Sequence, residues 1–460
     1  MLSLAIIICL LAPTIVLAST DKYAIEEIEY ISNTDTINFS KDDPDENIRY
    51  IGENPNNYIE FNGELWRIIG IIKNIKDADG NTDSRIKIIR NDILLNLSWD
   101  GSDHSINDGQ GVNEWSTSNI NKILNEDGYI NKKSVTCENG INGATNICDF
   151  TATGLNDDSK ELIDSVIWDL GSNWDINYRN AKASEFYQFP YSGKSGNYCT
   201  TGLYCTDTVD RTLTFTGLIG LIYPADYIYA TAGNSTTSRE TCLNDTVIKD
   251  WDDNNPDCYN TNWLTTNIQY WTMTPYTDTT YNSTAFFVKN KVGMRAAYYS
   301  YGLRPVVYLS NNLVIKSGNG SESSPYKVVL GRKVTFETNG GAKISNQVDE
   351  LNTQAQYVIP ERDGYNFGGW YLDKEYTTQF DFASNVSEDI TLYAKWTKND
   401  DIGTPINDTK TRNDDIEIKN PQTGDNLAFN LLMLGLSIIN LTGTVLYLKK
   451  KDFINVLNRK

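Results

Sequence analysis

Short apolar stretches with alternating polar positions recur along residues 40–330 and predict strands. In NYIEFNGELWRIIGII, two such stretches flank Asn62-Gly63, a dipeptide typical of a two-residue hairpin turn. A second hairpin is predicted from Ile68–Ile75 and Arg85–Ile89, which enclose the loop DADGNTDS. Later strands are predicted in YWTMTPY, STAFFVKN, GLRPVVYL and NLVIKSG.

Helical spacing is found in two stretches, Trp115–Leu124 and Ser159–Leu170. Long polar loops separate these helices from the strands. The pattern therefore predicts one α+β head domain over residues 40–330, preceded by a leader segment over residues 19–39.

An apolar run at the start of the chain predicts a signal peptide over residues 1–18. It ends in VLA, a pattern that a signal peptidase reads, and polar residues follow. The run is short for a membrane anchor. No Lys or Arg precedes it, so we expect a few further residues upstream. The chain is therefore predicted to be secreted.

A second apolar run, Leu427–Leu448, contains 22 residues without a charge. As a helix it would measure about 33 Å, enough to cross the hydrocarbon layer of a membrane. The tail over residues 449–460 begins with KKK and is expected to stay in the cytoplasm. Residues 397–419 are charged and lack aromatic side chains, which predicts a disordered stalk.

The formal net charge of -20 argues against a nucleic-acid partner, because phosphates require a basic patch. Such a charge suits a solvated, secreted protein, and divalent cations are candidate ligands. Six cysteines remain once the signal peptide is removed. An even number in an exported chain favours disulfides over zinc, since no C-x-x-C occurs and His104 is the single histidine. We expect neighbouring cysteines to pair: Cys137 with Cys148, Cys199 with Cys205, and Cys242 with Cys258.

A turn-forming motif, Asn420-Pro421-Gln422-Thr423-Gly424, precedes the apolar run and its lysines. This order resembles the sorting signal of Gram-positive wall proteins, in which sortase cleaves L-P-x-T-G between Thr and Gly. Asn420 stands where that pattern has Leu, as in a second sortase class. The resemblance implies that sortase joins Thr423 to a peptidoglycan amine, so that the membrane holds only the precursor. A plain single-pass protein is the alternative.

Residues 331–396 carry NGG at Asn339–Gly341, GYNF at Gly364–Phe367, GWY at Gly369–Tyr371 and LYAKW at Leu392–Trp396. This set closely resembles the Listeria–Bacteroides repeat, the internalin B-repeat. The resemblance implies a small β-grasp-like module that serves bacterial surface proteins as a spacer or binding unit. Its aromatic side chains are expected to form a core more than a ligand platform.

The segments FNGELWRIIG, GVNEW, ICDFTATGL, LIYPADYIYAT and GLRPVVYL of the head resemble a domain of unknown function common in surface proteins of gut Gram-positive bacteria. In the last part of the head, the order of WT, AFFV and GLRP along the chain more distantly resembles the C-type-lectin-like core shared with formylglycine-generating enzymes. All six cysteines are expected in bridges, so no reactive pair is left for that activity. We assign no catalytic residue, and a lone histidine in a polar loop, His104, does not indicate one.

Two acidic loops are candidate calcium sites. DADGNTDS places Asp77, Asp79, Asn81 and Asp83 at alternate positions, although its glycine and its last ligand depart from the helix-loop-helix pattern. WDDNNPD contributes Asp252 and Asp253. An ordinary hairpin loop is the alternative for the first of these loops.

Tyr298, Tyr299 and Tyr301 in AAYYSYG are candidate ligand-binding residues, because aromatic faces with polar tips suit sugars and glycoproteins. A role in a β-rich interior is the alternative. These features predict an adhesin or binding module for a host or microbial surface glycan or protein, anchored to the cell wall. A structural surface or pilus component and a wall-bound carbohydrate-active enzyme remain the alternatives.

Overall fold

The computed structural model describes residues 22–101, 111–173, 177–193, 196–197, 210–277 and 283–399. Within these residues the chain is mostly β with short helices. None of the helices in the described ranges is both long and apolar enough to span a membrane. The predicted signal peptide, sorting motif and apolar span lie outside the described residues, as do Cys199, Cys205 and His104. Most of the predicted stalk lies outside them too, but its first residues, Thr397 and Lys398, belong to strand Ile390–Lys398, which corrects the predicted start of the stalk.

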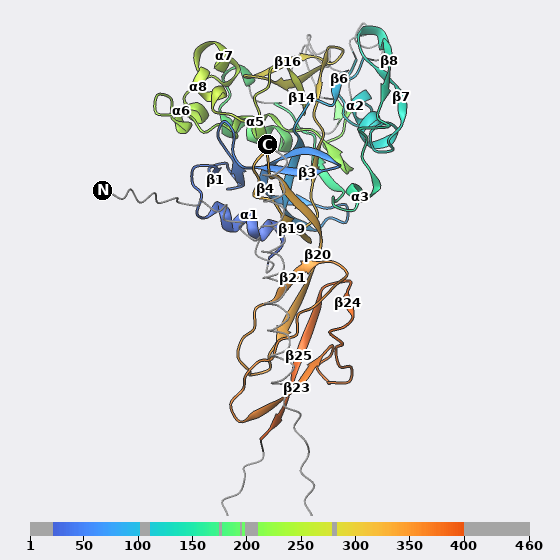
Figure 1. Ribbon diagram of the computed structural model, residues 1–460. Coiled ribbons are helices and arrows are strands. Elements are labelled where there is room, and N and C mark those ends of the chain that lie inside the picture. Colours follow the sequence, from blue (N-terminus) through green and yellow to red (C-terminus); the bar gives the residue numbers. More distant parts are fainter. Residues whose placement is uncertain are drawn as a thin grey trace, which may run out of the picture. The chain divides into compact units, whose positions relative to one another are not determined.

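The larger sheet of the head has the strand order β13-β18-β5-β4-β3-β20, with β1, β2 and β19 paired along it (Figure 1). Its strands are β1 Phe39–Ser40, β2 Ile48–Tyr50, β3 Tyr58–Phe61, β4 Glu64–Lys76, β5 Thr82–Arg90, β13 Ile219–Gly220, β18 Val306–Tyr308, β19 Leu313–Ser317 and β20 Tyr326–Glu337.

Both predicted hairpins are confirmed in this sheet. Phe61 pairs with Glu64 across the two-residue turn, where Asn62 and Gly63 have φ values of 58° and 75°. Asn and Gly tolerate this left-handed region, and the resulting turn twist matches that of the strands. Further along β4, a Cβ at Gly70 would lie 2.0 Å from the Ile48 carbonyl oxygen. The close approach of β2 to β4 therefore requires glycine there.

A second sheet in the head has the order β16-β15-β14-β17-β6. Strands were predicted in YWTMTPY, STAFFVKN and GLRPVVYL, and the structure confirms them as β14, β15 and the pair β17 and β18. The bounds are β6 Leu95–Ser98, β14 Tyr270–Tyr276, β15 Thr284–Val288, β16 Val292–Ala296 and β17 Ser300–Leu303.

The remaining strands of the head form short pairs. These are β7 Ser134–Glu138 with β8 Thr145–Asp149, β9 Val166–Asp169 with β12 Thr214–Gly217, and β10 Gly196–Asn197 with β11 Asp210–Arg211. The helix predicted over Ser159–Leu170 is wrong, because only its start is helical and the rest contains β9. Val166 and Ile167 are β-branched, and the partner strand β12 supplies backbone hydrogen bonds that a helix would have had to make internally.

The helices are short and lie mainly outside the sheets; α6, α7 and α8 gather on one side of the head (Figure 1). Their bounds are α1 Ala24–Ser32, α2 Asn119–Asn121, α3 Asp157–Lys160, α4 Ala183–Gln188, α5 Pro224–Ile228, α6 Arg239–Asn244, α7 Trp251–Asn254 and α8 Pro256–Asn260. A π-helical turn, Lys122–Glu126, follows α2, so the helix predicted over Trp115–Leu124 is found from Asn119 onward. The segment expected as a leader forms α1, whose Ala24 and Ile28 are buried in the head.

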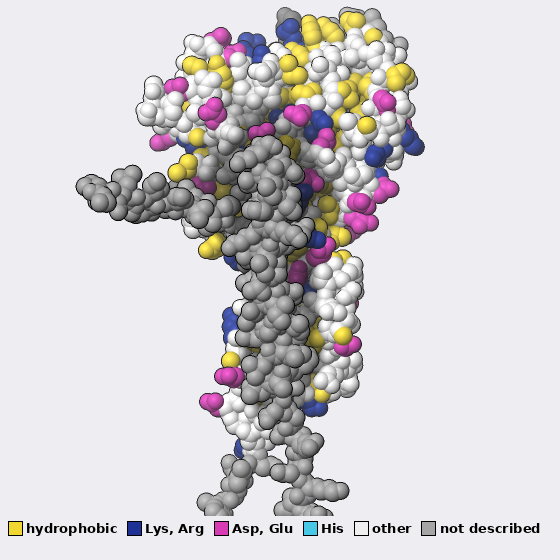
Figure 2. All heavy atoms as spheres, in the orientation of Figure 1, with side chains coloured by type: hydrophobic (Ala, Val, Ile, Leu, Met, Phe, Trp, Pro, Cys, Tyr) yellow, Lys and Arg dark blue, Asp and Glu magenta, His cyan; other side chains and the backbone are white. Residues whose placement is uncertain are grey.

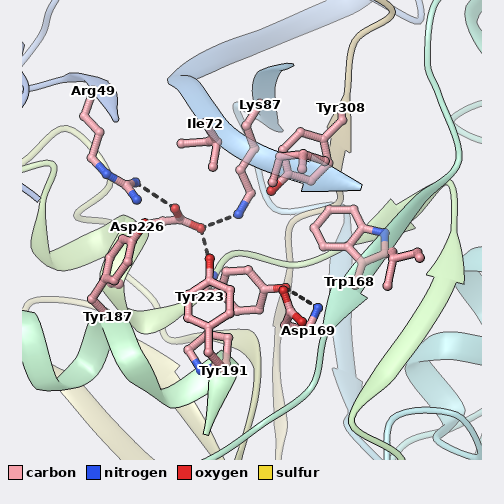
Figure 3. Close-up of a pocket in the computed structure, with 14 residues that line it drawn as sticks. Arg49, Ile72, Lys87, Trp168, Asp169, Tyr187, Tyr191, Tyr223, Asp226 and Tyr308 are labelled. Atoms are coloured by element: carbon pink, nitrogen blue, oxygen red, sulfur yellow. Dashed lines mark hydrogen bonds and ion pairs between the residues drawn. The ribbon is translucent and has the colours of Figure 1, made fainter. Parts of the chain in front are cut away.

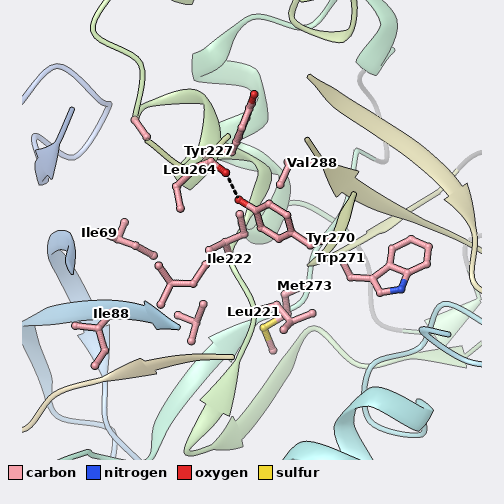
Figure 4. Packing of buried hydrophobic residues seen from close by; sticks show 14 of the residues in the cluster. Ile69, Ile88, Leu221, Ile222, Tyr227, Leu264, Tyr270, Trp271, Met273 and Val288 are labelled. Carbon is pink, nitrogen blue, oxygen red and sulfur yellow. Dashed lines mark hydrogen bonds between the residues drawn. The ribbon is translucent and has the colours of Figure 1, made fainter. Parts of the chain in front are cut away.

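The core of the head lies between its two sheets (Figure 4). Ile69 and Ile88 from the larger sheet face Ile222, whose carbonyl oxygen accepts a hydrogen bond from the Met273 amide of β14. Tyr270 is fully buried, and its hydroxyl donates to the Leu264 carbonyl oxygen at 2.8 Å. Helix α5 therefore follows a segment that both sheets hold.

Two disulfides lie within the described residues, Cys137–Cys148 and Cys242–Cys258. They are two of the three neighbouring pairs that the sequence predicts. The first joins β7 to β8, and the second joins α6 to α8, so each closes one local loop.

Strand β20 also belongs to the C-terminal module, where it pairs in parallel with β25 and antiparallel with β21. The strands of this module after β20 are β21 Gln347–Glu350, β22 Thr353–Gln354, β23 Tyr365–Tyr371, β24 Asn385–Val386 and β25 Ile390–Lys398. Over residues 331–399 the structure has no helix. The parallel central pair fits a β-grasp-like sheet, but no helix covers it.

The aromatic residues of the module form its core, as expected. The rings of Phe336 and Phe367 pack on Trp370 at centroid distances of 4.9 and 5.5 Å, and Trp370 is 1% exposed. The indole nitrogen of Trp396 donates to the Thr338 carbonyl oxygen at 2.8 Å. These side chains are committed to packing.

Candidate functional site

An open groove of about 440 Å³ lies on the head beside β16, and we call it the β16 groove. Figure 2 shows hydrophobic side chains gathered over this region of the head, with basic side chains beside them. The residues that line the groove come from β14 to β17, from the turn before α7 and from Tyr178; they are Tyr178, Lys249, Asp250, Gln269, Phe287, Lys291, Val292, Gly293, Met294, Arg295 and Tyr301.

The three predicted tyrosines lie together at this groove. Tyr301 lines it, and its ring packs on Phe287 at 5.0 Å and on Trp271 at 4.8 Å. Tyr299 lies 6.3 Å from Tyr301 and stacks on Tyr298 at 4.6 Å. All three tyrosines are half-buried, so they form a continuous aromatic surface at the edge of the core.

The groove carries three basic side chains in different electrostatic settings. Lys249 is paired with Asp250 at 2.5 Å, and Lys291 with Asp252 at 2.8 Å. The guanidinium of Arg295 lies 4.6 Å from the centre of the Tyr299 ring and has no carboxylate within 4 Å among the residues that the structure describes. A hydrogen bond with Tyr298 and the charge of Arg295 lower the pKa of Tyr299. Arg295 is therefore the cation available to an acidic ligand.

The candidate calcium residues lie on two separate elements. In the β4–β5 loop, the Asp77 carboxylate accepts hydrogen bonds from the amides of Asp79 and Asn81, while Asp83 is exposed. On α7, Asp252 is paired with Lys291 and Asp253 is exposed. No group of three or more acidic, His or Cys side chains is arranged for a metal ion within the described ranges. Calcium binding remains a prediction.

A second candidate, which the sequence did not predict, is a buried charge cluster between α5 and the larger sheet (Figure 3). Asp226 accepts from Arg49 Nη1 at 2.8 Å and from Lys87 Nζ at 2.6 Å. Arg49 Nε also donates to Asp43 at 2.5 Å. The side chains of all four residues are at most 5% exposed. Two positive and two negative charges thus compensate one another inside the head.

Aromatic rings surround the buried ammonium group. Lys87 Nζ lies 4.5 Å from the ring centre of Tyr223, 5.5 Å from that of Tyr308 and 5.7 Å from that of Trp168. Burial lowers the pKa of Lys87, and Asp226 offsets part of this effect. For Asp226 burial acts in the opposite direction, but Lys87 and Arg49 hold its pKa below the ordinary value. Ion pairs and ring faces therefore favour the charged form of both groups, against the effect of burial.

The cavity beside this cluster measures about 20 Å³. That is room for one water molecule and no substrate. Asp169 also lines it, and burial raises the pKa of this carboxyl to about 6, against the attraction of Lys76. The size of the cavity favours a structural role for the cluster. Its signal in the sequence was the presence of charged residues within otherwise apolar strands, as in IRY and RIKIIR.

The C-terminal module can be compared with known proteins. Residues 333–395 match the Listeria–Bacteroides repeat domain. This repeat contains the aromatic core described above, and the match confirms the family resemblance of the module.

The chain is 40% identical over 86 residues to Internalin H of Listeria monocytogenes, a match that covers 18% of this chain and 15% of that protein. It is 45% identical over 69 residues to a predicted membrane protein of Evansella cellulosilytica, covering 15% of this chain and 10% of the relative. The chain therefore spans a small part of these curated relatives, and the head is outside the repeat match.

Replacing Asp226 with Asn should destabilise the head by about 3 to 5 kcal/mol, because Lys87 would remain buried without a counter-charge and Arg49 would keep only Asp43. Urea unfolding measures this change. Asp157→Asn is the matched control: its carboxylate is 95% exposed and paired with Lys160, so little change in stability is expected. A loss of less than 1 kcal/mol in Asp226→Asn would contradict a structural role for the cluster.

The Asp169 carboxyl should make stability fall as pH rises. Its pKa is about 6 in the fold against 3.8 for the free side chain, so the fold favours the protonated form. This contribution is complete below about pH 4 and is lost as pH rises through 6, by about 3 kcal/mol in all. Relative to the original chain, Asp169→Asn should therefore gain stability between pH 4 and pH 7.5. A difference that stays constant across this range would argue against the raised pKa.

Proposed function

We propose that the chain is a secreted surface protein, joined to the cell wall through Asn420–Gly424, whose head binds an acidic glycan or glycoprotein in the β16 groove. The Listeria–Bacteroides repeat supports surface display, since Internalin H and a predicted membrane protein share similarity with this chain. The repeat would act as a spacer, because its aromatic side chains are buried in its own core.

The observation that carries the binding proposal is the chemistry of the β16 groove. Aromatic rings with polar edges form a surface on which a sugar ring can pack. Arg295 adds a planar guanidinium with no carboxylate partner within the part of the chain that the structure describes. In a chain with a net charge of -20, such an uncompensated cation favours a ligand that brings a carboxylate or sulfate.

The enzyme alternative has less support. The cavity beside Asp226, where burial raises the pKa of Asp169, has room for one water molecule. The Asp226 carboxylate and the Lys87 ammonium group in its wall are already paired with one another. A structural surface role would also use the wall anchor but would not require the groove.

Binding should depend on both the aromatic and the cationic side of the groove. On an array of matched acidic and neutral glycans, Arg295→Gln and Tyr301→Ala in the full chain should each weaken binding to acidic glycans about tenfold or more. The interaction should also weaken as salt is raised. The matched controls are Arg362→Gln, whose guanidinium covers Tyr365 in the repeat at 3.8 Å, and Tyr357→Ala, which is 56% exposed.

These control variants should bind like the original chain. If no glycan on the array is bound, or if the groove and control variants behave alike, the groove is not the ligand site. The structural alternative would then become the leading one.

Wall anchoring predicts a specific covalent product. Mass spectrometry of muramidase-released wall should find a peptide that ends at Thr423 and carries a wall amine. Pro421→Ala should abolish this product, since the fixed bend before the cleaved bond is lost. Pro405→Ala in the predicted stalk is the control and should leave the product in place. An intact Thr423-Gly424 bond in all recovered material would remove sortase anchoring from the proposal.

A further inference from the structure

A separate cavity of about 210 Å³ lies in the head beneath α1. Its wall is formed by α1, the turn that follows it, β1 and β2 on one side, and by β19 and β20 on the other. Helix α1 contacts β19 directly, so the cavity lies where the first helix closes over the larger sheet. It is about ten times the volume of the cavity beside Asp226.

The charged side chains that line this cavity are all acidic. Glu27 and Asp35 both contribute carboxylates, and no Lys or Arg is among the residues that form the cavity wall. Asp35 accepts from the amides of Ile37 and Asn38, which fixes its orientation. The field inside the cavity therefore favours a positively charged ligand and disfavours an anion.

One carboxylate oxygen is left unsatisfied. Glu27 Oε2 is buried and has no hydrogen-bond donor within the described ranges. Lys22 Nζ forms a long ion pair with this oxygen at 3.9 Å, which is beyond hydrogen-bonding distance. A buried ionised acceptor without a donor is costly, so a ligand that supplies a donor would gain free energy there.

Aromatic rings form the other part of the wall. Phe39 and Tyr50 pack at a centroid distance of 4.1 Å, and Tyr326 lies beside them. Burial raises the pKa of both tyrosines, and Asp35 adds to the shift, so their hydroxyls stay protonated. The faces of such rings attract cations, while Ile31 and Ile315 supply apolar contacts.

We infer that this cavity, the α1 cavity, binds a small organic molecule that carries a primary ammonium group. An ammonium group has three donors and no acceptor, so it complements carboxylate oxygens, and its charge suits the ring faces. A ring-sized apolar body would occupy the space between Ile31 and Ile315. This inference concerns a different cavity from the β16 groove and does not depend on the proposed function.

The test compares three probes of equal size on the full chain by isothermal titration calorimetry: cyclohexylammonium, cyclohexanol and cyclohexanecarboxylate. Cyclohexylammonium should bind about tenfold or more tightly than cyclohexanol, because a hydrogen bond to a charged group replaces a neutral one. Cyclohexanecarboxylate should not bind. This comparison does not rely on the folding of any variant.

Two variants then locate the site. Glu27→Gln keeps the shape of the side chain but removes its charge, and should abolish the preference for cyclohexylammonium. Glu29→Gln on the exposed side of the same helix should leave that preference unchanged. Glucosamine and lysinamide, tested next, distinguish an amino sugar from an amino-acid side chain as the source of the ammonium group.

Three results would overturn the inference. Equal affinity for cyclohexylammonium and cyclohexanol would show a cavity that selects only for shape. Tighter binding of the carboxylate would contradict the sign of the field. No heat from cyclohexylammonium up to about 10 mM, or a preference unaffected by Glu27→Gln, would show that the α1 cavity is not an ammonium site.

Discussion

The shared ion pair of Asp226 with Arg49 and Lys87 is the interaction on which the arrangement of the head depends. It joins the start of α5 to β2 and β5, across sequence separations of 177 and 139 residues. Removing Asp226 leaves Lys87 buried without a counter-charge, whereas a missing apolar contact would leave only a gap. The cluster thus holds α5 in one position against the larger sheet.

The position of α5 also affects the second sheet. The segment just before α5 contains Ile222, whose carbonyl oxygen binds the Met273 amide of β14, and Tyr270 of the same strand is buried against it. Strand β14 pairs with β15 and β17, which present Phe287 and Tyr301 to the β16 groove. The buried charges and the exposed groove are therefore parts of one packing arrangement, although they lie on different surfaces of the core.

The three concave features of the head differ in how their polar groups are satisfied. Beside Asp226 the charges of Arg49, Lys87, Asp43 and Asp226 are paired with one another, and the cavity has room for a single water molecule. In the β16 groove most charges are paired, and Arg295 lies over a tyrosine ring. In the α1 cavity no Lys or Arg lines the wall, and Glu27 has only a long ion pair with Lys22 at 3.9 Å. The structural cavity differs from the two candidate sites both in its small volume and in the pairing of its charged groups.

The sequence by itself determined those features that depend only on interactions between residues close together in the chain. The Asn62-Gly63 turn needs only two residues that tolerate positive φ between apolar strands, and the neighbouring cysteines need only a short loop to meet. The repeat could be recognised from the sequence because its aromatic residues form a small core of their own.

Tertiary structure decided the rest. Residues 166–169 have a helical pattern, but β12 supplies backbone partners and makes them a strand. Arg49 and Lys87 are both paired with Asp226, which lies 177 and 139 residues away in the chain, so no spacing in the sequence could reveal which charges would be neutralised. Whether a side chain belongs to the core or to a binding site depends on which residues the fold places next to it. These tertiary contacts cannot be read from the pattern of a single sequence.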